Sequence, residues 1–415
     1  MQVCVSRRQF VGAMVGGAVA AWAPRSPAAA EPKLAPRTAW TVQSWHNEAF
    51  EAARRDAPRV KAMADYLLRG YQRLMPGEKR EQIGRLLAES NRKRLAAVPD
   101  LAKYPELRGM PELVAASWRG RQEGAGLDDV QAAVHNDGNW YMHRGLCRKA
   151  QRAPAHCTWV FFGRSDHGPL MGNNLDTTPD EPYGPPEFPA LDEHIVCGSV
   201  SSGVFFDEQS PEIFPAPVPK LVARYCRNAE EAAEMFARYN FFWGPCNLLV
   251  ADRQLRVAMI EKSACRIGVR WGKDGFGFVT AMTAEHPEMN KFLAERRAAS
   301  LAPRGLKAPC ADTRYWAAQD QRRAILNRLI DAARRGPTVE KLRSILQYRG
   351  PDGVVCGNGE VLFPGDPPIE HTIRTQITCL KEGRALWWTR DNSTGTPSWQ
   401  HPMPEHRLEN APLWQ

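Results

Sequence analysis

The sequence has little of what marks a membrane or nucleic-acid-binding protein. Its apolar run near the N-terminus, residues 11–23, is too short to span a bilayer comfortably. Lys and Arg are scattered through helix-like stretches, and a net charge of +9 is mild for 415 residues. There is no internal repeat or low-complexity tract. We therefore expect a soluble globular protein with one large core or two ordinary ones, no nucleic-acid partner and no membrane contact beyond an N-terminal signal.

The cysteines lack the spacing of a metal site. None of the ten forms a C-x-x-C pair or a Cys/His pattern typical of zinc, so we expect no structural metal and no cofactor. If Cys4 is lost with a signal peptide, nine remain. An odd number in an oxidising compartment implies at least one free thiol, and Cys157 is the candidate. The other eight could form up to four disulfides or stay reduced.

The N-terminus has the order of an export signal. Arg7 and Arg8 precede Phe10 and a mildly apolar, Gly/Ala-rich run, and the small residues 28–30 offer a cleavage site. Adjacent arginines before a weakly apolar run resemble a twin-arginine signal. We predict a signal peptide over residues 1–30 and a periplasmic or secreted protein. An ordinary secretory signal and an uncleaved anchor are the alternatives.

The first part of the chain is predicted to be helical. Val60, Met63, Leu67, Tyr71 and Leu74 recur at three- and four-residue steps within residues 38–100. We predict that residues 31–156 form a helical segment, either an α chain or a pro-region.

From Cys157 onward the pattern changes to strands. Short β-branched and aromatic runs occupy residues 158–162, 199–206, 247–251, 255–260, 373–380 and 385–388. Helices are predicted after Asn228, with Glu231 completing a variant capping box, and over residues 317–334. Helices inserted between groups of strands favour an α+β fold, with helices outside two packed sheets. Residues 157–415 would form the catalytic part.

Cys157 is a candidate nucleophile. A thiol attacks an acyl group well only after it loses its proton, which a partner histidine or the residue's own α-amino group could accept. An α-amino group has a pKa of about 7.7 to 8.0, close to that of a thiol at about 8.5. The second route requires cleavage of the chain before Cys157.

Six stretches in order resemble the N-terminal-nucleophile hydrolases of the acyl-coenzyme A:isopenicillin-N acyltransferase type, and more distantly the choloylglycine hydrolases. They are GLDD at 126–129, Cys157-Thr158, GNNLD at 172–176, GSVSSG at 198–203, CNLLVAD at 246–252 followed by Ile260-Glu261, and the Thr-containing strand at 372–380 followed by RALWW at 384–388. The resemblance covers about residues 125–400. It implies a four-layer αββα sandwich and hydrolysis or transfer of an acyl group at a linear amide.

The resemblance also implies residue roles. Cys157 would be the nucleophile and, through its amino group, the base; Asp176 would hold that amino group. Asn247 would donate to the oxyanion, with the backbone near Ser202 or Gly203 as a second donor. The two chains made by self-cleavage would stay associated.

Several residues are predicted to contact a small-molecule amide substrate. Trp159 and Phe161 share a strand face with Cys157 and could line an acyl pocket, although a plain core role is an equal alternative. Asn173 stands where the family often has Arg or Gln. Arg322 or Arg323 matches a family arginine. Other departures are Thr177, which replaces an aromatic, and Glu285-His286, which replaces an Asn-His pair.

Two other classes of protein remain open. A papain-like peptidase would use Cys157, His286 and Asn392, but the surround of Cys157 lacks the Gly-Ser-Cys sequence of that family. A non-catalytic exported binding protein on the same fold would leave the chain uncut.

Overall fold

The computed structural model describes residues 39–98, 100–137, 157–177, 182, 194–201, 217–239, 246–263, 266–302, 305–357, 371–390, 397 and 405–407. All of them belong to one compact unit, Pro36–Gln415. The predicted signal peptide, the stretch just before Cys157, Ser202, Gly203 and Asn392 lie outside the described residues.

The helices predicted over residues 38–100 are present. They are α2 (Val42–Arg55), α3 (Ala57–Leu74) and α4 (Arg80–Ala96), and they are followed by a short 3-10 turn η1 (Pro105–Leu107), α5 (Met110–Ala125) and α6 (Asp129–Asp137). Thr41 caps α2 by accepting a hydrogen bond from the backbone N–H of Ser44. The periodic Leu67 and Tyr71 pack with Ile83 of α4 in a small core within this segment.

Helices α2 and α5 pack at very close range. A Cβ atom on Gly120 would lie 2.2 Å from the backbone oxygen of His46, and one on Gly124 would lie 2.3 Å from that of Phe50. Only glycine fits at such a distance, because any side chain would force the helices apart. His46 Nε2 and Glu123 Oε2, 2.9 Å apart, join the same two helices.

The rest of the described chain contains two larger antiparallel sheets and a two-stranded one. The six-stranded sheet has the order β12 (Glu405–Arg407), β11 (Arg384–Thr389), β10 (His371–Cys379), β2 (Leu170–Thr177), β1 (Thr158–Phe162), β7 (Phe276–Thr280). The four-stranded sheet has the order β3 (Ile195–Ser201), β4 (Cys246–Asp252), β5 (Val257–Lys262), β6 (Ile267–Trp271). Strands β8 (Arg349–Gly350) and β9 (Gly353–Val354) form the small sheet.

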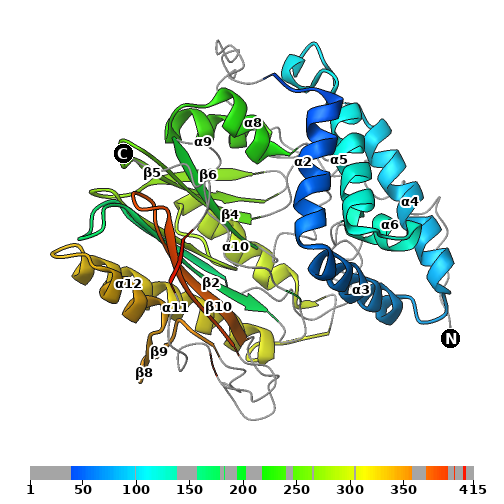
Figure 1. Cartoon of the computed structure of the whole chain (residues 1–415). Helices are drawn as coiled ribbons and strands as arrows, with labels where there is room; N and C mark the ends of the chain where they lie inside the picture. Colours follow the sequence, from blue (N-terminus) through cyan, green and yellow to red (C-terminus); the bar gives the residue numbers. More distant parts are fainter. Residues whose placement is uncertain are drawn as a thin grey trace. The chain divides into compact units, whose positions relative to one another are not determined.

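Helices cover the outer faces of both larger sheets. They are α8 (Val218–Tyr225) and α9 (Ala229–Arg238) on the four-stranded sheet, and α11 (Ala311–Ala333) and α12 (Val339–Leu346) on the six-stranded sheet. Helix α10 (Pro287–Ala299) lies beside the edge strand β6. Figure 1 shows α8 and α9 beside the four-stranded sheet, and α11 and α12 beside β2 and β10. The α+β class predicted from the sequence is confirmed.

Three apolar cores lie between these layers. Phe161, Met171 and Leu249 pack in the core between the two sheets. A second core joins the outer face of the six-stranded sheet to α11 and α12. A third joins α8, α9 and the four-stranded sheet to residues of α2 and α5. The order is therefore helix, sheet, sheet, helix, and the helical segment adds to the outer core beside α8 and α9.

Burial on both faces explains the composition of the central strands. Every residue of β4 and β5 is buried, and both are mainly apolar. Two of their buried polar residues, Asn247 and Glu261, are directly paired near the same end of the two strands.

Some element boundaries differ from the prediction. Strand β3 begins at Ile195, four residues before the predicted start, and α11 begins at Ala311 instead of residue 317. The capping residue Asn228 was predicted correctly: its side chain accepts from the backbone N–H of Glu231, and the Glu231 carboxylate accepts from that of Arg227.

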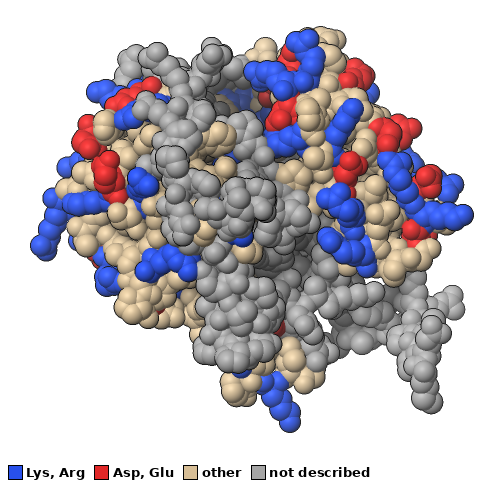
Figure 2. Space-filling view, turned by 60° about the horizontal axis from the view of Figure 1, so that its bottom comes forward, with Lys and Arg blue, Asp and Glu red and all other residues tan. Residues whose placement is uncertain are grey.

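The surface carries mixed charge. Figure 2 shows Lys and Arg side chains interspersed with Asp and Glu over the described part of one face. In the described part of the chain, no helix is both long and apolar enough to cross a membrane.

Candidate functional site

Cys157 lies at the start of the six-stranded sheet, directly before β1. Its side chain is half-buried, and its Sγ donates a hydrogen bond to the backbone oxygen of Asp176, 3.7 Å away. Its own carbonyl accepts from the backbone N–H of Ala281 at 3.0 Å. The cysteine is thereby fixed between the end of β2 and the chain leaving β7.

Asp176 is a buried carboxylate with two strong partners. Oδ2 accepts from Arg322 at 2.8 Å, and Oδ1 accepts from the Thr372 hydroxyl at 2.6 Å. Thr372 in turn accepts from the backbone N–H of Gly357 at 3.0 Å, and Arg322 also donates to the carbonyl of Val355 at 2.6 Å. The guanidinium compensates the buried negative charge, so the carboxylate is held in one orientation.

Asn247 lies on β4, and its side chain points into the space between the sheets. Its Nδ2 donates to the carbonyl oxygens of Thr280 at 2.9 Å and Thr283 at 2.8 Å. A side-chain amide nitrogen carries two hydrogens, so both are bound by this one stretch of backbone. Donation to an oxyanion would require one of these bonds to be exchanged.

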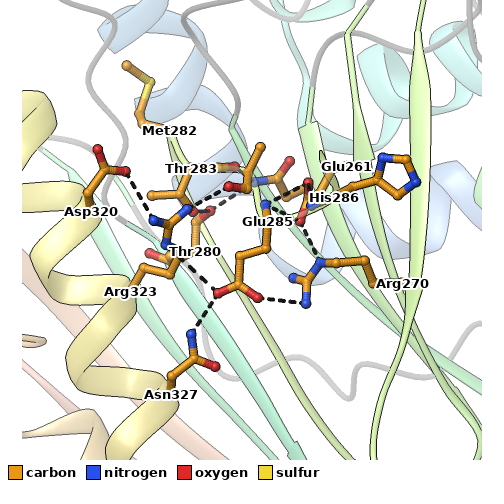
Figure 3. Close-up of polar contacts among 12 residues, drawn as sticks. Glu261, Arg270, Thr280, Met282, Thr283, Glu285, His286, Asp320, Arg323 and Asn327 are labelled. Carbon is orange, nitrogen blue, oxygen red and sulfur yellow. Dashed lines mark hydrogen bonds and ion pairs between the residues drawn. The ribbon is translucent and has the colours of Figure 1, made fainter. Parts of the chain in front are cut away.

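The stretch of backbone that contacts Asn247 is residues 280–286, which we call the 280–286 turn. It follows β7 and contacts Cys157 through Ala281. Figure 3 shows Glu261 and Arg270 on one side of this turn and Arg323 on the other. The turn therefore touches two of the three residues to which the sequence assigned catalytic roles.

The neighbouring arginines of α11 point to different partners. Arg322 is buried and binds Asp176, whereas Arg323 donates to the carbonyl of Ala284 at 2.5 Å and lies 3.8 Å from Glu285. Both guanidinium groups contact protein groups around the candidate site. These contacts make Arg322 the one that reaches Asp176, a register that the sequence left open.

The predicted substrate-binding residues Trp159, Phe161 and Asn173 face the space between the sheets. Phe161 is fully buried in the core there, which agrees with the plain core alternative. Trp159 is half-buried, and its Nε1 donates to the carbonyl of Ser199 at 3.1 Å. Its ring occupies the space that a side chain at Gly198 would need.

Asn173 lies directly opposite Trp159 on β2. It is 3% exposed, and no donor among the described residues lies within hydrogen-bond distance of its buried Oδ1. The neighbouring Asn174 faces the other way, donating to the carbonyl of Leu346 and accepting from Thr375. Asn173 thus presents an unused acceptor on the sheet face that also carries Trp159.

His286 lies elsewhere. Its ring packs over Gly268 of β6, the edge strand of the four-stranded sheet, and its buried Nδ1 has no hydrogen-bond partner in the part of the chain that the structure describes. In Figure 3 the ring is turned away from Thr280 and Met282. Cys157 contacts Asp176 and Ala281, whereas the His286 ring contacts β6, so the geometry does not show a Cys157–His286 pair.

No disulfide joins two cysteines among the described residues, which include Cys157, Cys197, Cys246 and Cys310. No group of three or more His, Cys, Asp or Glu side chains that could hold a metal ion occurs among the described residues.

Sequence reasoning missed several residues around the site. Thr372 and Glu261 fall inside the matched motifs but received no role, and Arg270 was not singled out. The available signal for Glu261 was a charged residue near the end of the apolar run VAMIEK. Thr280 and Thr283 contribute through backbone carbonyls, which no residue pattern reveals.

The described chain is an α+β protein with a cysteine, an aspartate and an asparagine gathered around the start of one central strand. No protein-family model matches the sequence. No curated protein matches it either.

Among solved structures, the chain is similar to two forms of conjugated bile acid hydrolase from Clostridium perfringens. A mutant form matches with 12% identity and a TM-score of 0.34, covering 61% of this chain and 98% of the other. A second variant matches with 11% identity and a TM-score of 0.30, covering 63% and 91%. Both TM-scores are below 0.5, so this likeness assigns neither fold nor function to the chain.

Proposed function

We propose that this chain is a self-processing cysteine amidohydrolase or acyltransferase of the N-terminal-nucleophile type, which cleaves linear amide bonds through a thioester. The observation that carries the proposal is the convergence of Cys157, Asp176 and Asn247 at the start of β1. Cys157 bonds to the backbone of Asp176, and both Cys157 and Asn247 bond to the 280–286 turn. Substrates of the class would be N-acyl amino acids, small peptide-like molecules or β-lactam-related amides.

Activation would be a cleavage between His156 and Cys157. The thiol attacks the carbonyl carbon of His156, the peptide C–N bond breaks, and a thioester and a free α-amino group form. Water then hydrolyses the thioester, which releases the His156 carboxylate and regenerates the thiol. The new amino group becomes the base that the thiol needs.

Each residue then has a separate role in turnover. Asp176, held by Arg322 and Thr372, orients the amino group of Cys157. Asn247 donates to the oxygen that becomes negative when the thiolate attacks, with the backbone near Ser202 or Gly203 as a second donor. Arg323 supports the 280–286 turn.

Substrate recognition would use the sheet face next to Cys157. The unused Oδ1 of Asn173 suits an N–H group of an amide substrate, because a buried acceptor without a donor is unfavourable until a ligand supplies one. Trp159 offers the adjacent apolar surface. Phe161 supports this surface from within the core.

We further propose that residues 1–30 direct export by the twin-arginine route. The two arginines and the mildly apolar run support this. Changing Arg7 and Arg8 to Lys should leave the chain inside the cell. Export that survives this change would point to the general secretory route.

The test is intact-mass analysis and amide hydrolysis by exported, purified protein, compared with single variants. The wild type should show two chains, about 31–156 and 157–415. Cys157→Ala should stay uncut and inactive. Asn247→Ala should be exported and folded but lose turnover by about a hundred- to a thousandfold. Asn91→Ala is the matched control, because Asn91 is also a buried amide donating to a carbonyl, that of Ala133. It should retain turnover.

The alternatives give different results. A papain-like enzyme would be active as one chain and would lose activity in His286→Ala, while Asp176→Asn would be unaffected. A binding protein would show neither processing nor turnover. A single active chain in denaturing mass analysis would falsify the mechanism proposed here.

A further inference from the structure

Glu261 is a buried carboxylate next to Asn247. It is 2% exposed on β5 and pairs directly with Asn247 of β4. Side chains at directly paired positions of an antiparallel sheet lie on the same face. The carboxylate therefore enters the space between the sheets beside the Asn247 amide.

Three donors compensate the Glu261 charge. Oε1 accepts from the backbone N–H of Glu285 and from Arg270 Nε, each at 2.9 Å, and Oε2 accepts from the backbone N–H groups of Glu285 and His286, each at 2.9 Å. Arg270 also binds the Glu285 carboxylate at 2.7 Å. One side chain thus holds two consecutive backbone N–H groups with charge-assisted bonds, as Figure 3 shows.

The 280–286 turn needs such support. Met282 has a φ of 63°, in the left-handed region, which is unfavourable for a residue with a long side chain. A strained residue persists only where its surroundings hold it. Arg297 donates to the carbonyl of Met282 at 2.7 Å and Arg323 to that of Ala284 at 2.5 Å. Glu261 is the carboxylate that holds the end of the same turn.

We propose that Glu261 is a positioning residue: it fixes the 280–286 turn, and the turn orients the Asn247 amide and the Cys157 backbone. Thr280 and Thr283 supply the two carbonyls that bind Asn247, and Ala281 supplies the N–H that binds Cys157. The effect on turnover rests on the proposed function. The effect on the turn does not.

Glu261→Gln is the variant that tests this. It keeps the size of the side chain but replaces one accepting oxygen with an NH2 group, which would face backbone N–H donors. We expect faster hydrogen exchange in peptides covering 280–286. We also expect kcat to fall by roughly ten- to a hundredfold, less than on removal of the Asn247 donor itself, with KM within about threefold.

Asp252→Asn is the matched control. Asp252 is a fully buried carboxylate at the other end of β4, and it accepts from the backbone N–H groups of Ala229 at 2.9 Å and Arg256 at 3.1 Å. Replacing this carboxylate should speed hydrogen exchange around the start of α9 and leave the amides of the 280–286 turn protected. Turnover should stay within about twofold of the wild type at matched folded fraction.

A double variant decides whether Glu261 acts through Asn247. If it does, adding Glu261→Gln to Asn247→Ala should lower kcat by no more than about twofold further. The proposal is overturned if the two losses multiply, if Asp252→Asn lowers kcat as much, or if exchange in the turn is unchanged. If the wild type hydrolyses no amide, the proposed function is wrong. Hydrogen exchange in the 280–286 turn then tests by itself whether Glu261 fixes the turn.

Discussion

The thiols of Cys197 and Cys246 in the four-stranded sheet are kept protonated by their surroundings. Burial, reinforced by the neighbouring Cys246 thiol, raises the pKa of Cys197. Burial raises the pKa of Cys246 to about 11, although Lys262 acts in the opposite direction. The thiolate is the reactive form of cysteine. These two cysteines are therefore poor nucleophiles at neutral pH.

Cys246 should make the protein sensitive to alkali. Its folded-state pKa of about 11 is above the ordinary value of a thiol, so above about pH 8.5 the unfolded chain releases a proton that the folded chain keeps. The stability contributed by the neutral thiol is complete below that pH and is lost as pH rises toward 11. In urea unfolding from pH 8 to 10.5, wild type should lose more stability than Cys246→Val. A constant difference between the two across this range would contradict the shift.

Some of the individual residues of the candidate site could be predicted from the sequence. Asp176 and Asn247 were predictable because they belong to motifs of a recognisable spacing, and the structure places both near Cys157. Glu261 and Thr372 were not assigned roles, because their importance depends on a turn and a strand that approach only in the folded chain.

Among the elements, α6 contains a histidine held in its neutral form. Burial and then Arg121 lower the pKa of His135 to about 4, with Arg59 adding to the effect. Protonation would place a second cation beside the Arg121 guanidinium, which lies 3.5 Å from His135 Nδ1. The end of the helical segment is therefore a point of weakness in acid.

Acid should destabilise the helical segment through His135. The His135 imidazole binds a proton near pH 6.5 in the unfolded chain, whereas in the folded chain it stays neutral until the pH falls to about 4. Stability from the neutral ring is complete above pH 6.5 and is lost as pH falls from there toward 4. His135→Gln cannot be protonated, so its free energy of unfolding should decline less than that of wild type between pH 7 and 4.5. Parallel curves would show that His135 is not responsible.

The strands show why boundaries were harder to predict than element types. Residues 158–162 were assigned correctly because an unbroken β-branched and aromatic run is a local signal. Strand β3 began earlier than expected because Gly198 weakens its pattern. That glycine is required by tertiary packing, since the Trp159 ring fills the space of its missing side chain. Strand β7, which contains Gly277, was missed for a similar reason.

Across the molecule, the helical segment is joined to the sheet layers by a mostly buried ion pair. Arg238 of α9 binds Glu106 at 2.8 Å and donates to the carbonyl of Lys103 at 2.7 Å. Lys220 lies 4.5 Å from the Trp45 ring. The shared core buries the apolar faces of the segment, and these polar contacts lie beside it. The segment should thus remain bound after the proposed cleavage before Cys157.

Arg238→Met should weaken this association in processed protein. The change leaves the Glu106 carboxylate buried without its partner, which typically costs about 3–5 kcal/mol. In native gel filtration at falling concentration, the two chains of wild type should elute together, while those of the variant should separate. Lys220→Met is the control: its pair with Glu48 is exposed, and methionine can still pack on the Trp45 ring that Lys220 contacts, so the chains should stay together. Equal retention of both variants would show that the apolar core alone holds the segment.

The close crossing of α2 and α5 also limits how this protein can diverge. Gly120 and Gly124 each face backbone atoms that leave no room for a methyl group, so neither position can drift without moving a whole helix. Arg119 and Glu123, each one position before one of these glycines, are both exposed. In distantly related sequences, these two glycines should therefore be retained four positions apart while the residues around them are substituted. The glycine pair would then identify the helix crossing even where the remaining sequence has diverged.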